Sequence, residues 1–273
     1  MSLIPKEIET YYLQSRESER LSNEWGELER LRTQAILTRY LPSAPAVIFD
    51  VGGAAGVYAL PLAKQGYEVH LIDAVDLHLE QARRYAAELG VALASSTHGD
   101  ARHLEVPSST ADAVLLLGPL YHLVEHSDRL QALRESRRIL KPRGLLFAAS
   151  ICRFASLIDG LSRGFFRDAE FRKIVAADLA CGRHCNPTNE LAYFTTAYFH
   201  RPEELAAEVR DAGFDHVEIL SVEGPAWSAA VFREVWNDAV QRQSLMDFLS
   251  LIESEPSVHG ASAHLMAVAR RPN

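Results

Sequence analysis

The chain has 273 residues, of which 48% are hydrophobic, so it can form one sizeable core with insertions. Its 36 Asp and Glu outnumber its 28 Lys and Arg, which argues against a general attraction to nucleic acid or to an anionic membrane and favours a small-molecule partner. The first thirty residues lack the apolar run of a signal peptide or membrane span, and 3 cysteines are too few for a disulfide framework, so a cytoplasmic location is expected.

The chain up to residue 45 carries apolar side chains at roughly helical intervals among many charges, which predicts helices before the sheet. AVIFDV (46–51) is then a continuous apolar run of the kind that buried parallel strands show. Further strands are expected at 67–73, 91–98, 111–118 and 144–150, and helices between them at 57–66, 76–90 and 128–141. Because strands that alternate with helices form a parallel sheet, residues 46–150 are predicted to be the core.

The regular alternation stops after residue 150, and residues 151–200 contain aromatic side chains without a clear period. We interpret them as an inserted cap. Residues 201–273 return to the core with a helix at 202–214, strands at 216–223 and 264–271, and a helical insertion at 224–262. The pattern predicts an α/β fold, with a Rossmann-like, doubly wound, mostly parallel sheet of seven strands and helices on both faces.

A glycine-rich turn, DVGGAAG (50–56), follows the first predicted strand. Glycine lets the backbone turn sharply and approach a ligand, and the next helix would present free N–H groups there. Asp73 ends the second strand, where a carboxylate can accept hydrogen bonds from ribose hydroxyls; the alternative is a helix cap, a role that Asp76 could also fill. Asp100 follows the third strand and could meet an adenine amino group, or be an ordinary turn aspartate.

These residues resemble the first motifs of the class I S-adenosylmethionine-dependent methyltransferase family. DVGGAAG is similar to the family's D-x-G-x-G-x-G, with Ala54 in place of the middle glycine, and the resemblance extends over about residues 46–223. It implies an antiparallel final hairpin (216–271) and S-adenosylmethionine as the cofactor. The residues it would place around the cofactor are Asp50, Gly52, Gly53, Ala54, Gly56, Tyr58, Asp73, Ala74, Asp100, Ala101, Leu117 and Gly118. A nicotinamide-binding enzyme would instead need G-x-G-x-x-G, which is not present.

LLGPLYHL (116–123) follows the fourth strand, at the edge where this family places its substrate. A tight turn there would aim Tyr121 and His122 from a rigid base. His122 is the candidate to take a proton from the nucleophile, and Tyr121 to line the site; the alternatives are a packed tyrosine and a structural histidine. The reaction implied is methyl transfer to an O, N, S or C atom of a small molecule.

N-terminal helices of this family often close over the cofactor, so the resemblance implies an N-terminal helical lid over residues 1–45. On that basis Tyr12 is a cofactor-binding candidate, and Arg30 is the candidate to receive the methionine carboxylate, the alternative for both being a solvated helix face. His200, where the cap rejoins the core, is a further residue that could face the substrate. His264 opens the last strand and is expected to pack or pair locally.

Cys181, His184 and Cys185 lie within five positions, but no second pair of ligands accompanies them, so no metal is expected. Two other functions remain open. A non-catalytic S-adenosylmethionine-binding sensor or partner subunit is favoured by Ala54, and an RNA methyltransferase would need a local basic, aromatic groove. An apolar helix face in the insertions is compatible with an oligomer.

Overall fold

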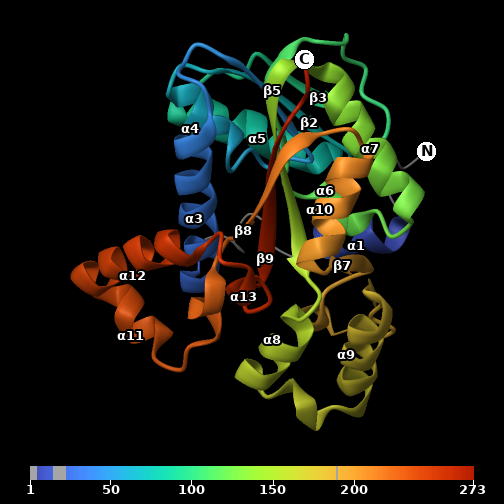
Figure 1. The fold of residues 1–273 in the computed structure, drawn as a ribbon, viewed down its shortest axis with the longest axis vertical. Helices are drawn as coiled ribbons and strands as arrows, with labels where there is room; N and C mark the ends of the chain where they lie inside the picture. Colours follow the sequence, from blue (N-terminus) through green and yellow to red (C-terminus); the bar gives the residue numbers. More distant parts are fainter. Residues whose placement is uncertain (1–4, 15–22, 189) are drawn as a thin grey trace.

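The computed structural model describes residues 5–14, 23–188 and 190–273. A central sheet runs through the molecule with helices on both faces (Figure 1). Across the sheet its seven main strands follow the order β3-β2-β1-β4-β5-β9-β8. Their bounds are β1 Val47–Val51, β2 Glu68–Asp73, β3 Ser95–His98, β4 Ala111–Leu116, β5 Leu140–Cys152, β8 Asp215–Ser221 and β9 His264–Arg270.

The first five of these strands pair in parallel, whereas β9 is antiparallel to both β5 and β8. This confirms the predicted fold class, the seven expected strands and the final hairpin. Two short strands were not predicted, β6 (Arg183–His184) and β7 (Ala197–His200), and β7 pairs with the last residues of β5. They bring the sheet to nine strands.

Each face of the sheet is covered by its own helices. One face packs against α3 (Glu24–Tyr40), α4 (Ala59–Lys64) and α5 (Asp76–Leu89), and the other against α7 (His126–Ile139) and α10 (Pro202–Asp211). Local sequence sets several helix ends. Asn23 accepts hydrogen bonds from the first amides of α3, and Gly90 ends α5 in the left-handed conformation.

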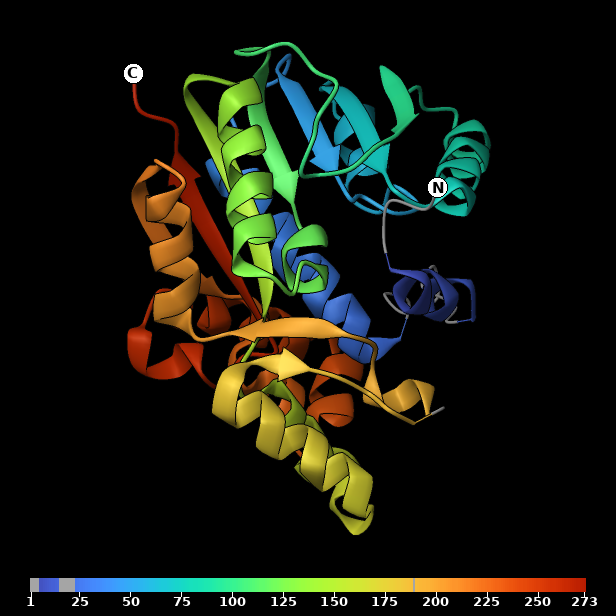
Figure 2. The same ribbon diagram turned by 90° about the vertical axis from the view of Figure 1, so that its right-hand side faces the viewer.

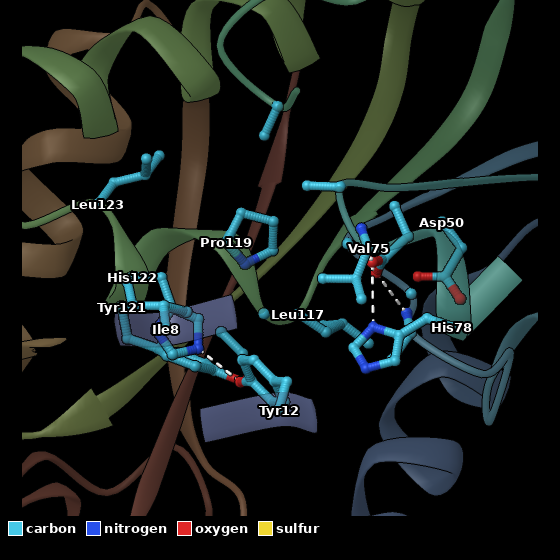
Figure 3. A pocket seen from close by; sticks show the side chains of 18 of the residues that line it. Ile8, Tyr12, Asp50, Val75, His78, Leu117, Pro119, Tyr121, His122 and Leu123 are labelled. Atoms are coloured by element: carbon cyan, nitrogen blue, oxygen red, sulfur yellow. Dashed lines mark hydrogen bonds and ion pairs between the residues drawn. The ribbon is translucent and has the colours of Figure 1, made fainter. Parts of the chain in front are cut away.

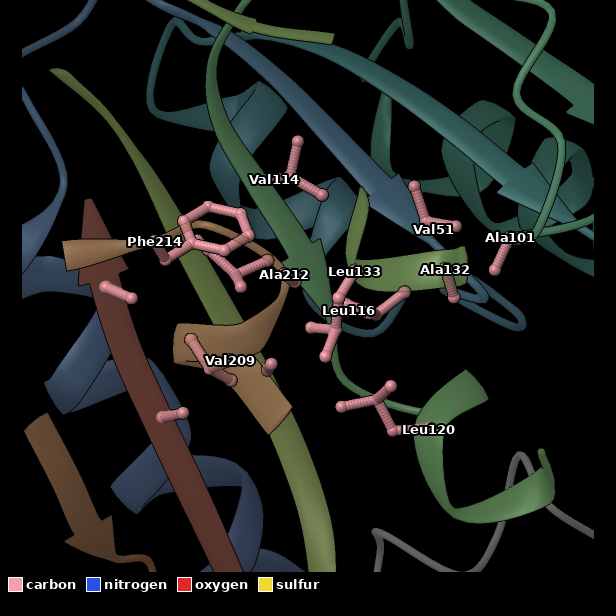
Figure 4. Packing of buried hydrophobic residues seen from close by; sticks show 14 of the residues in the cluster. Val51, Ala101, Val114, Leu116, Leu120, Ala132, Leu133, Val209, Ala212 and Phe214 are labelled. Carbon is pink, nitrogen blue, oxygen red and sulfur yellow. The ribbon is translucent and has the colours of Figure 1, made fainter. Parts of the chain in front are cut away.

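The strand β4 shows how a buried parallel strand supplies both cores. Ala113 and Leu115 pack toward α3, α4 and α5, whereas Val114 and Leu116 pack toward α7 and α10 (Figure 4). This is why the strand reads as a continuous apolar run rather than an alternating one. With both faces covered, the carboxyl edge of the sheet is the place where a ligand can approach.

The chain reverses direction across the sheet at β1, because β2 and β3 lie on one side of it and β4 on the other. In doubly wound sheets this switch point leaves a crevice outside the carboxyl ends of the strands. The antiparallel β9 begins at the same edge, since His264 pairs with Ile151 near the end of β5. Residues from β1, β2, β4, β5 and β9 can therefore meet there.

Residues 151–200 fold beyond the end of β5, in the lower part of Figure 1. They contain α8 (Ala155–Arg163), α9 (Ala169–Cys181), β6 and β7. The insertion 224–262 contains α11 (Phe232–Asn237), α12 (Ala239–Ile252) and α13 (Pro256–His259), and it packs Phe232, Trp236 and Leu249 around Leu28 of α3.

The short helix α1 (Lys6–Gln14) lies at the carboxyl edge, drawn in dark blue in Figure 2. None of the helices that the structure describes combines the length and the apolarity needed to cross a membrane.

Candidate active site

A cavity of about 310 Å³ opens at the carboxyl edge of the sheet. It is walled by the turns after β1, β2, β3 and β4 and by side chains of α1, α3, β5 and β9 (Figure 3). Most residues predicted from the sequence line it: Tyr12, Asp50, Gly52, Gly53, Ala54, Tyr58, Asp73, Ala74, Asp100, Ala101, Leu117, Gly118, Tyr121 and His122.

The turn after β1 needs a glycine at position 52 because Pro119 packs directly against it. Gly52 has φ +71°, and a Cβ there would come 2.5 Å from Cγ of Pro119, the residue that starts α6 (Pro119–His122). Two backbone amides of this turn, which comes before the next helix, are already engaged. The Gly52 N–H donates to the Ile72 carbonyl (2.7 Å) and the Ala54 N–H to Oδ2 of Asp73 (2.8 Å), because the turn is tied to the end of β2.

Ala54 takes the left-handed conformation, with φ +47°. This explains why the motif usually carries glycine at that position, since an L-residue with a Cβ costs about 1–2 kcal/mol there. Gly56, also predicted at the cofactor, does not line the cavity. It has φ +81° and packs against Leu60, where a Cβ would lie 3.2 Å from Cγ, so its requirement for glycine comes from the fold.

Asp73 joins the turns after β1 and β2. Besides the Ala54 amide, its carboxylate accepts hydrogen bonds from the Val75 N–H (2.9 Å) and from Nδ1 of His78 (3.0 Å). Asp73 is not the cap of α5, because the cap position of that helix is Val75 and no side chain caps it. A carboxylate offers about four lone-pair sites. With three of them in use, Asp73 keeps acceptor capacity toward the cavity.

Asp50, at the end of β1, is fully buried, and neither of its oxygens has a well-aligned hydrogen bond from the described residues. Burial, and then the negative charge of Asp73, raise the pKa of Asp50 to about 7; the Ala59 amide lowers it only in part. A buried carboxylate without a partner is costly. A positively charged ligand in the cavity would therefore be stabilised by Asp50.

Asp100 lies at the far side of the same cavity, after β3. Its carboxylate binds the Arg102 guanidinium (2.7 Å) and the Arg102 backbone N–H (2.8 Å), and Arg102 also reaches Asp128 at 2.8 Å. The turn-aspartate alternative thus describes part of what Asp100 does. It still faces the cavity, together with Ala101, Arg102 and Asp128.

Tyr12 and His122 meet across the cavity mouth. The hydroxyl of Tyr12, on α1, lies 2.5 Å from Nε2 of His122, joined by a dashed line in Figure 3. Burial lowers the pKa of His122 to about 4, although the Thr196 backbone and the charge of Asp73 oppose that shift. A neutral ring therefore accepts the hydrogen bond from the tyrosine. Tyr121 packs edge-on against His122, with ring centroids 4.7 Å apart.

Arg30 and His200 are not at the cavity. Arg30 lies on the outward side of α3, 3.4 Å from Glu27, so the helix-face alternative describes it; Glu29 and Thr33 are the α3 residues that line the cavity. His200 is fully buried in β7 and binds Glu208 of α10 at 3.1 Å. The unpredicted pairing of β7 with β5 turns it toward α10 rather than toward a ligand.

The cysteine and histidine cluster of the cap does not assemble a metal centre. Both ring nitrogens of His184 are engaged, Nδ1 with Asp178 (2.9 Å) and Nε2 with the Tyr193 carbonyl (2.8 Å), while Cys181 and Cys185 are exposed.

A different set of residues lies at the cavity. Potential ligand atoms of Glu29, Glu223 and His264 fall within 4.8 Å of one another. His264 was expected to pack or pair locally; it pairs with Glu223, 41 residues earlier in the chain, and it also lines the cavity. The sequence did not predict that these three residues lie together, because they belong to distant segments of the chain. The signal that could have found it is the antiparallel hairpin, which starts β9 at the carboxyl edge.

Comparison with known proteins bears on the same region. Residues 48–144 match the family model described as a methyltransferase domain. A ubiquinone biosynthesis O-methyltransferase of Caulobacter vibrioides is 28% identical over 112 residues, which cover 41% of this chain and 43% of that protein. A ubiquinone/menaquinone biosynthesis C-methyltransferase of Caulobacter sp. is 31% identical over 127 residues, which cover 44% and 49%. The chain thus spans less than half the length of these curated relatives.

The structural likeness extends further than the sequence likeness. A solved S-adenosylmethionine-dependent methyltransferase from Methanosarcina mazei has a TM-score of 0.58 at 17% identity, covering 87% of this chain and 97% of that one. Residues 48–144 thus match a methyltransferase domain, and the chain has the class I methyltransferase fold. The family match spans β1 to the start of β5, the part of the chain that carries Asp50, Asp73 and Asp100.

The cavity fits S-adenosylmethionine in two respects. Asp50 is a buried carboxylate that lacks a well-aligned partner, which suits a cationic ligand. Asp73 and Asp100 place acceptors at the ends of β2 and β3, where ribose hydroxyls and an adenine amino group need them.

Proposed function

We propose that the protein transfers a methyl group from S-adenosylmethionine to an O, N, S or C atom of a small molecule. The observation that carries this is the placement of Asp50 and Asp73 in one cavity, within a domain that matches methyltransferases. S-adenosylmethionine supplies an activated methyl group, so the protein has to position two molecules and exclude water. Positioning of this kind is worth roughly 7–11 kcal/mol of the barrier.

In this proposal the cavity has two ends. Asp50, Asp73 and Asp100 bind the cofactor, with the backbone of Gly52 to Ala54, Ala74, Leu117 and Gly118 shaping its seat and Tyr58 beside it. Tyr121 and His122 line the place of transfer. Tyr12 brings α1 across the mouth through its bond to His122, which would keep water out while the methyl group moves.

A small acceptor agrees with the charges around the cavity. Among the described residues that line it, Arg102 is the one Lys or Arg, and Asp100 and Asp128 already bind it. This favours an enzyme of small molecules over the RNA methyltransferase alternative, which would need free basic groups for phosphates. The names of the relatives include both O- and C-methyltransferases, so the acceptor atom stays open. We place the activity in the cytoplasm, because the chain's three cysteines are all unpaired thiols.

The proposal is tested by incubating the purified protein with cofactor that carries a labelled methyl group and with a metabolite extract. Label should pass to a small molecule, and S-adenosylhomocysteine should bind saturably in calorimetry. Saturable binding without any transfer of label would favour the non-catalytic sensor or partner subunit. An absence of binding would refute both functions.

A further inference from the structure

The backbone of the cap is strained at Phe194, which follows the single-turn helix η2 (Leu191–Tyr193). Phe194 has φ +68° and ψ −173°, a conformation that almost no residue except glycine adopts. Its N–H donates to the Leu191 carbonyl (3.2 Å), and Nδ2 of Asn186 donates to its carbonyl (2.8 Å). The strained backbone is therefore held on both sides, at a position where glycine would fold more easily.

The ring of Phe194 lies among aromatic side chains of two other elements. Its centroid is 5.3 Å from that of Tyr11 on α1, in an edge-on arrangement. On α6 it is 5.8 Å from the ring of His122 and 6.4 Å from that of Tyr121. Tyr121 and His122 line the cavity and define the transfer site, whereas Phe194 is not one of the lining residues. Phe194 therefore reaches the transfer site through these neighbours.

The helix α1 depends on such contacts, because a helix of 9 residues is not stable by itself in water. Its Ile8 is buried, its Tyr12 meets Nε2 of His122 at 2.5 Å, and its Tyr11 packs against Phe194. The rings of Tyr11 and Tyr12 also pack edge-on against each other, 5.5 Å apart. The contact between Phe194 and Tyr11 therefore lies next to the hydrogen bond that closes the cavity mouth.

The cap holds the residue before Phe194 in place from its interior. The Tyr193 carbonyl lies 2.8 Å from Nε2 of His184, whose Nδ1 is 2.9 Å from the fully buried Asp178 of α9. The Tyr193 hydroxyl donates to Oδ2 of Asp168, the cap residue of α9, at 2.8 Å. Because β6 and α9 both fix Tyr193, the ring of Phe194 is presented to α1 and α6 from a rigid base.

We propose that Phe194 is a positioning residue, which holds α1 against α6 so that Tyr12 meets His122. This rests on the proposed function and deepens it, because it gives the cap a part in closing the transfer site. Strained residues persist where the surrounding structure fixes them, and they cluster at functional sites. The ring accounts for the strain here, since glycine would relieve the strain but would leave α1 without this contact.

The test compares two changes at Phe194 with a matched control, each made in the whole chain. Phe194→Ala removes the ring and keeps the strain, and Phe194→Gly removes both. Phe166→Ala is the control, because Phe166 is also a half-buried ring of the cap but packs in the cluster around Phe171, within the cap. Circular dichroism checks that all three variants fold.

Thermal unfolding tests the strain itself. Phe194→Gly should unfold at a higher temperature than Phe194→Ala, since glycine adopts this conformation freely. Glycine also makes the unfolded chain more flexible, but an alanine that cannot adopt the native backbone without strain loses more stability than this flexibility costs. An equal or lower midpoint for Phe194→Gly would overturn the proposal, because residue 194 would then not be strained.

The second readout is hydrogen exchange of the α1 amides, measured by mass spectrometry. Phe194→Ala and Phe194→Gly should each make these amides exchange about threefold faster or more, because a helix that loses an anchor opens more often. Phe166→Ala should leave the exchange of α1 unchanged. Unchanged exchange in both Phe194 variants would refute the proposal, whether or not the protein transfers methyl groups.

The third readout is label transfer to the metabolite extract, at a temperature where every variant is folded. Phe194→Ala and Phe194→Gly should each transfer about tenfold more slowly, whereas Phe166→Ala should keep the parent rate. Combining Phe194→Ala with Tyr12→Phe should add little to the larger single loss, since residues that act as a unit are not additive.

Single losses that multiply in the double variant, or the parent rate in both Phe194 variants, would refute this inference and leave the proposed function standing. An absence of transfer by the parent protein would count against the proposed function instead. The exchange of α1 would still decide the role of Phe194 in that case, so the two failures are distinguishable.

Discussion

The two ends of the cavity are built in different ways. The cofactor end takes most of its residues from one stretch of chain, between Asp50 and Arg102, in which each strand of the core delivers one turn to the carboxyl edge. The opposite end is assembled from α3, β5, the end of β8 and the start of β9. Proteins that bind the same cofactor at the first end can therefore differ in the residues of the second end.

Electrostatics separates the two ends as well. At the cofactor end Asp50 is buried beside Asp73 with its pKa raised to about 7, so the site suits a positive charge that the described residues do not supply. At the other end the carboxylate of Glu223 is already paired with a histidine. The first end therefore gains stability when a cation binds.

The largest expected effect comes from the junction of the two ends. His122→Ala should lower turnover by about 100-fold, because the ring that closes the mouth with Tyr12 is lost, while cofactor affinity changes little. Tyr12→Phe, which removes only the hydroxyl, should give a smaller loss in the same direction. Steady-state kinetics with labelled cofactor measures both, and a His122→Ala protein with the parent rate would return this residue to a packing role.

Asp73→Ala should weaken the binding of S-adenosylmethionine at least tenfold, since it removes the acceptor expected for the ribose and leaves the Ala54 and Val75 amides without their partner. Calorimetry measures the affinity. Asp73→Asn is the matched variant, as it keeps one oxygen and the shape, and circular dichroism checks that both proteins fold. If Asp73→Ala binds as tightly as the parent, the assignment of Asp73 to the cofactor falls.

Cofactor affinity should also depend on pH through Asp50. In the free protein the pKa of Asp50 is about 7, and a bound cation lowers it, so binding releases a proton when the pH is below that value. Affinity should therefore rise, by up to about tenfold, between pH 6 and pH 8 and then level off. Calorimetry of S-adenosylmethionine in buffers of different ionisation enthalpy reports the proton release. The same dependence in Asp50→Asn would show that another group is responsible.

The sequence predicts the strands of the core better than it predicts the structure of residues 151–200. Continuous apolar runs predict strands such as β1 and β4, because parallel strands buried on both faces have this composition. The polar strand β3 and the largely exposed strand β8 are instead expected from the alternation of strands with helices that end in glycine. The strands β6 and β7 escape notice since each is short and lies in an aperiodic stretch, and His200 is misread with them. Their pairing depends on where β5 ends in space, which no local pattern encodes.

The same distinction holds within the site. A motif confined to a few positions brings Asp50, Gly52 and Asp73 to the cavity as predicted. Arg30 is misplaced because helical phase decides which side of α3 faces the cavity, and charge alone does not reveal that phase. His264 and Glu29 lie at opposite ends of the chain, and only the antiparallel hairpin brings them together.

The smallest expected effect comes from Ala54, which replaces the middle glycine of the family motif. Changing it to glycine tests whether the alanine weakens cofactor binding. Ala54 has φ +47°, a conformation that glycine adopts without strain. Ala54→Gly should relieve about 1 kcal/mol of backbone strain in the folded protein, but glycine also makes the unfolded chain more flexible by a similar free energy, so thermal unfolding should shift by only a few degrees. Cofactor affinity should stay the same or improve, since the Ala54 N–H keeps its bond to Asp73 and a methyl group is removed from the cavity wall. A clear loss of affinity in Ala54→Gly would mean that the alanine methyl itself contacts the ligand, and the turn after β1 would then be adapted to something other than the usual seat of the methionine group.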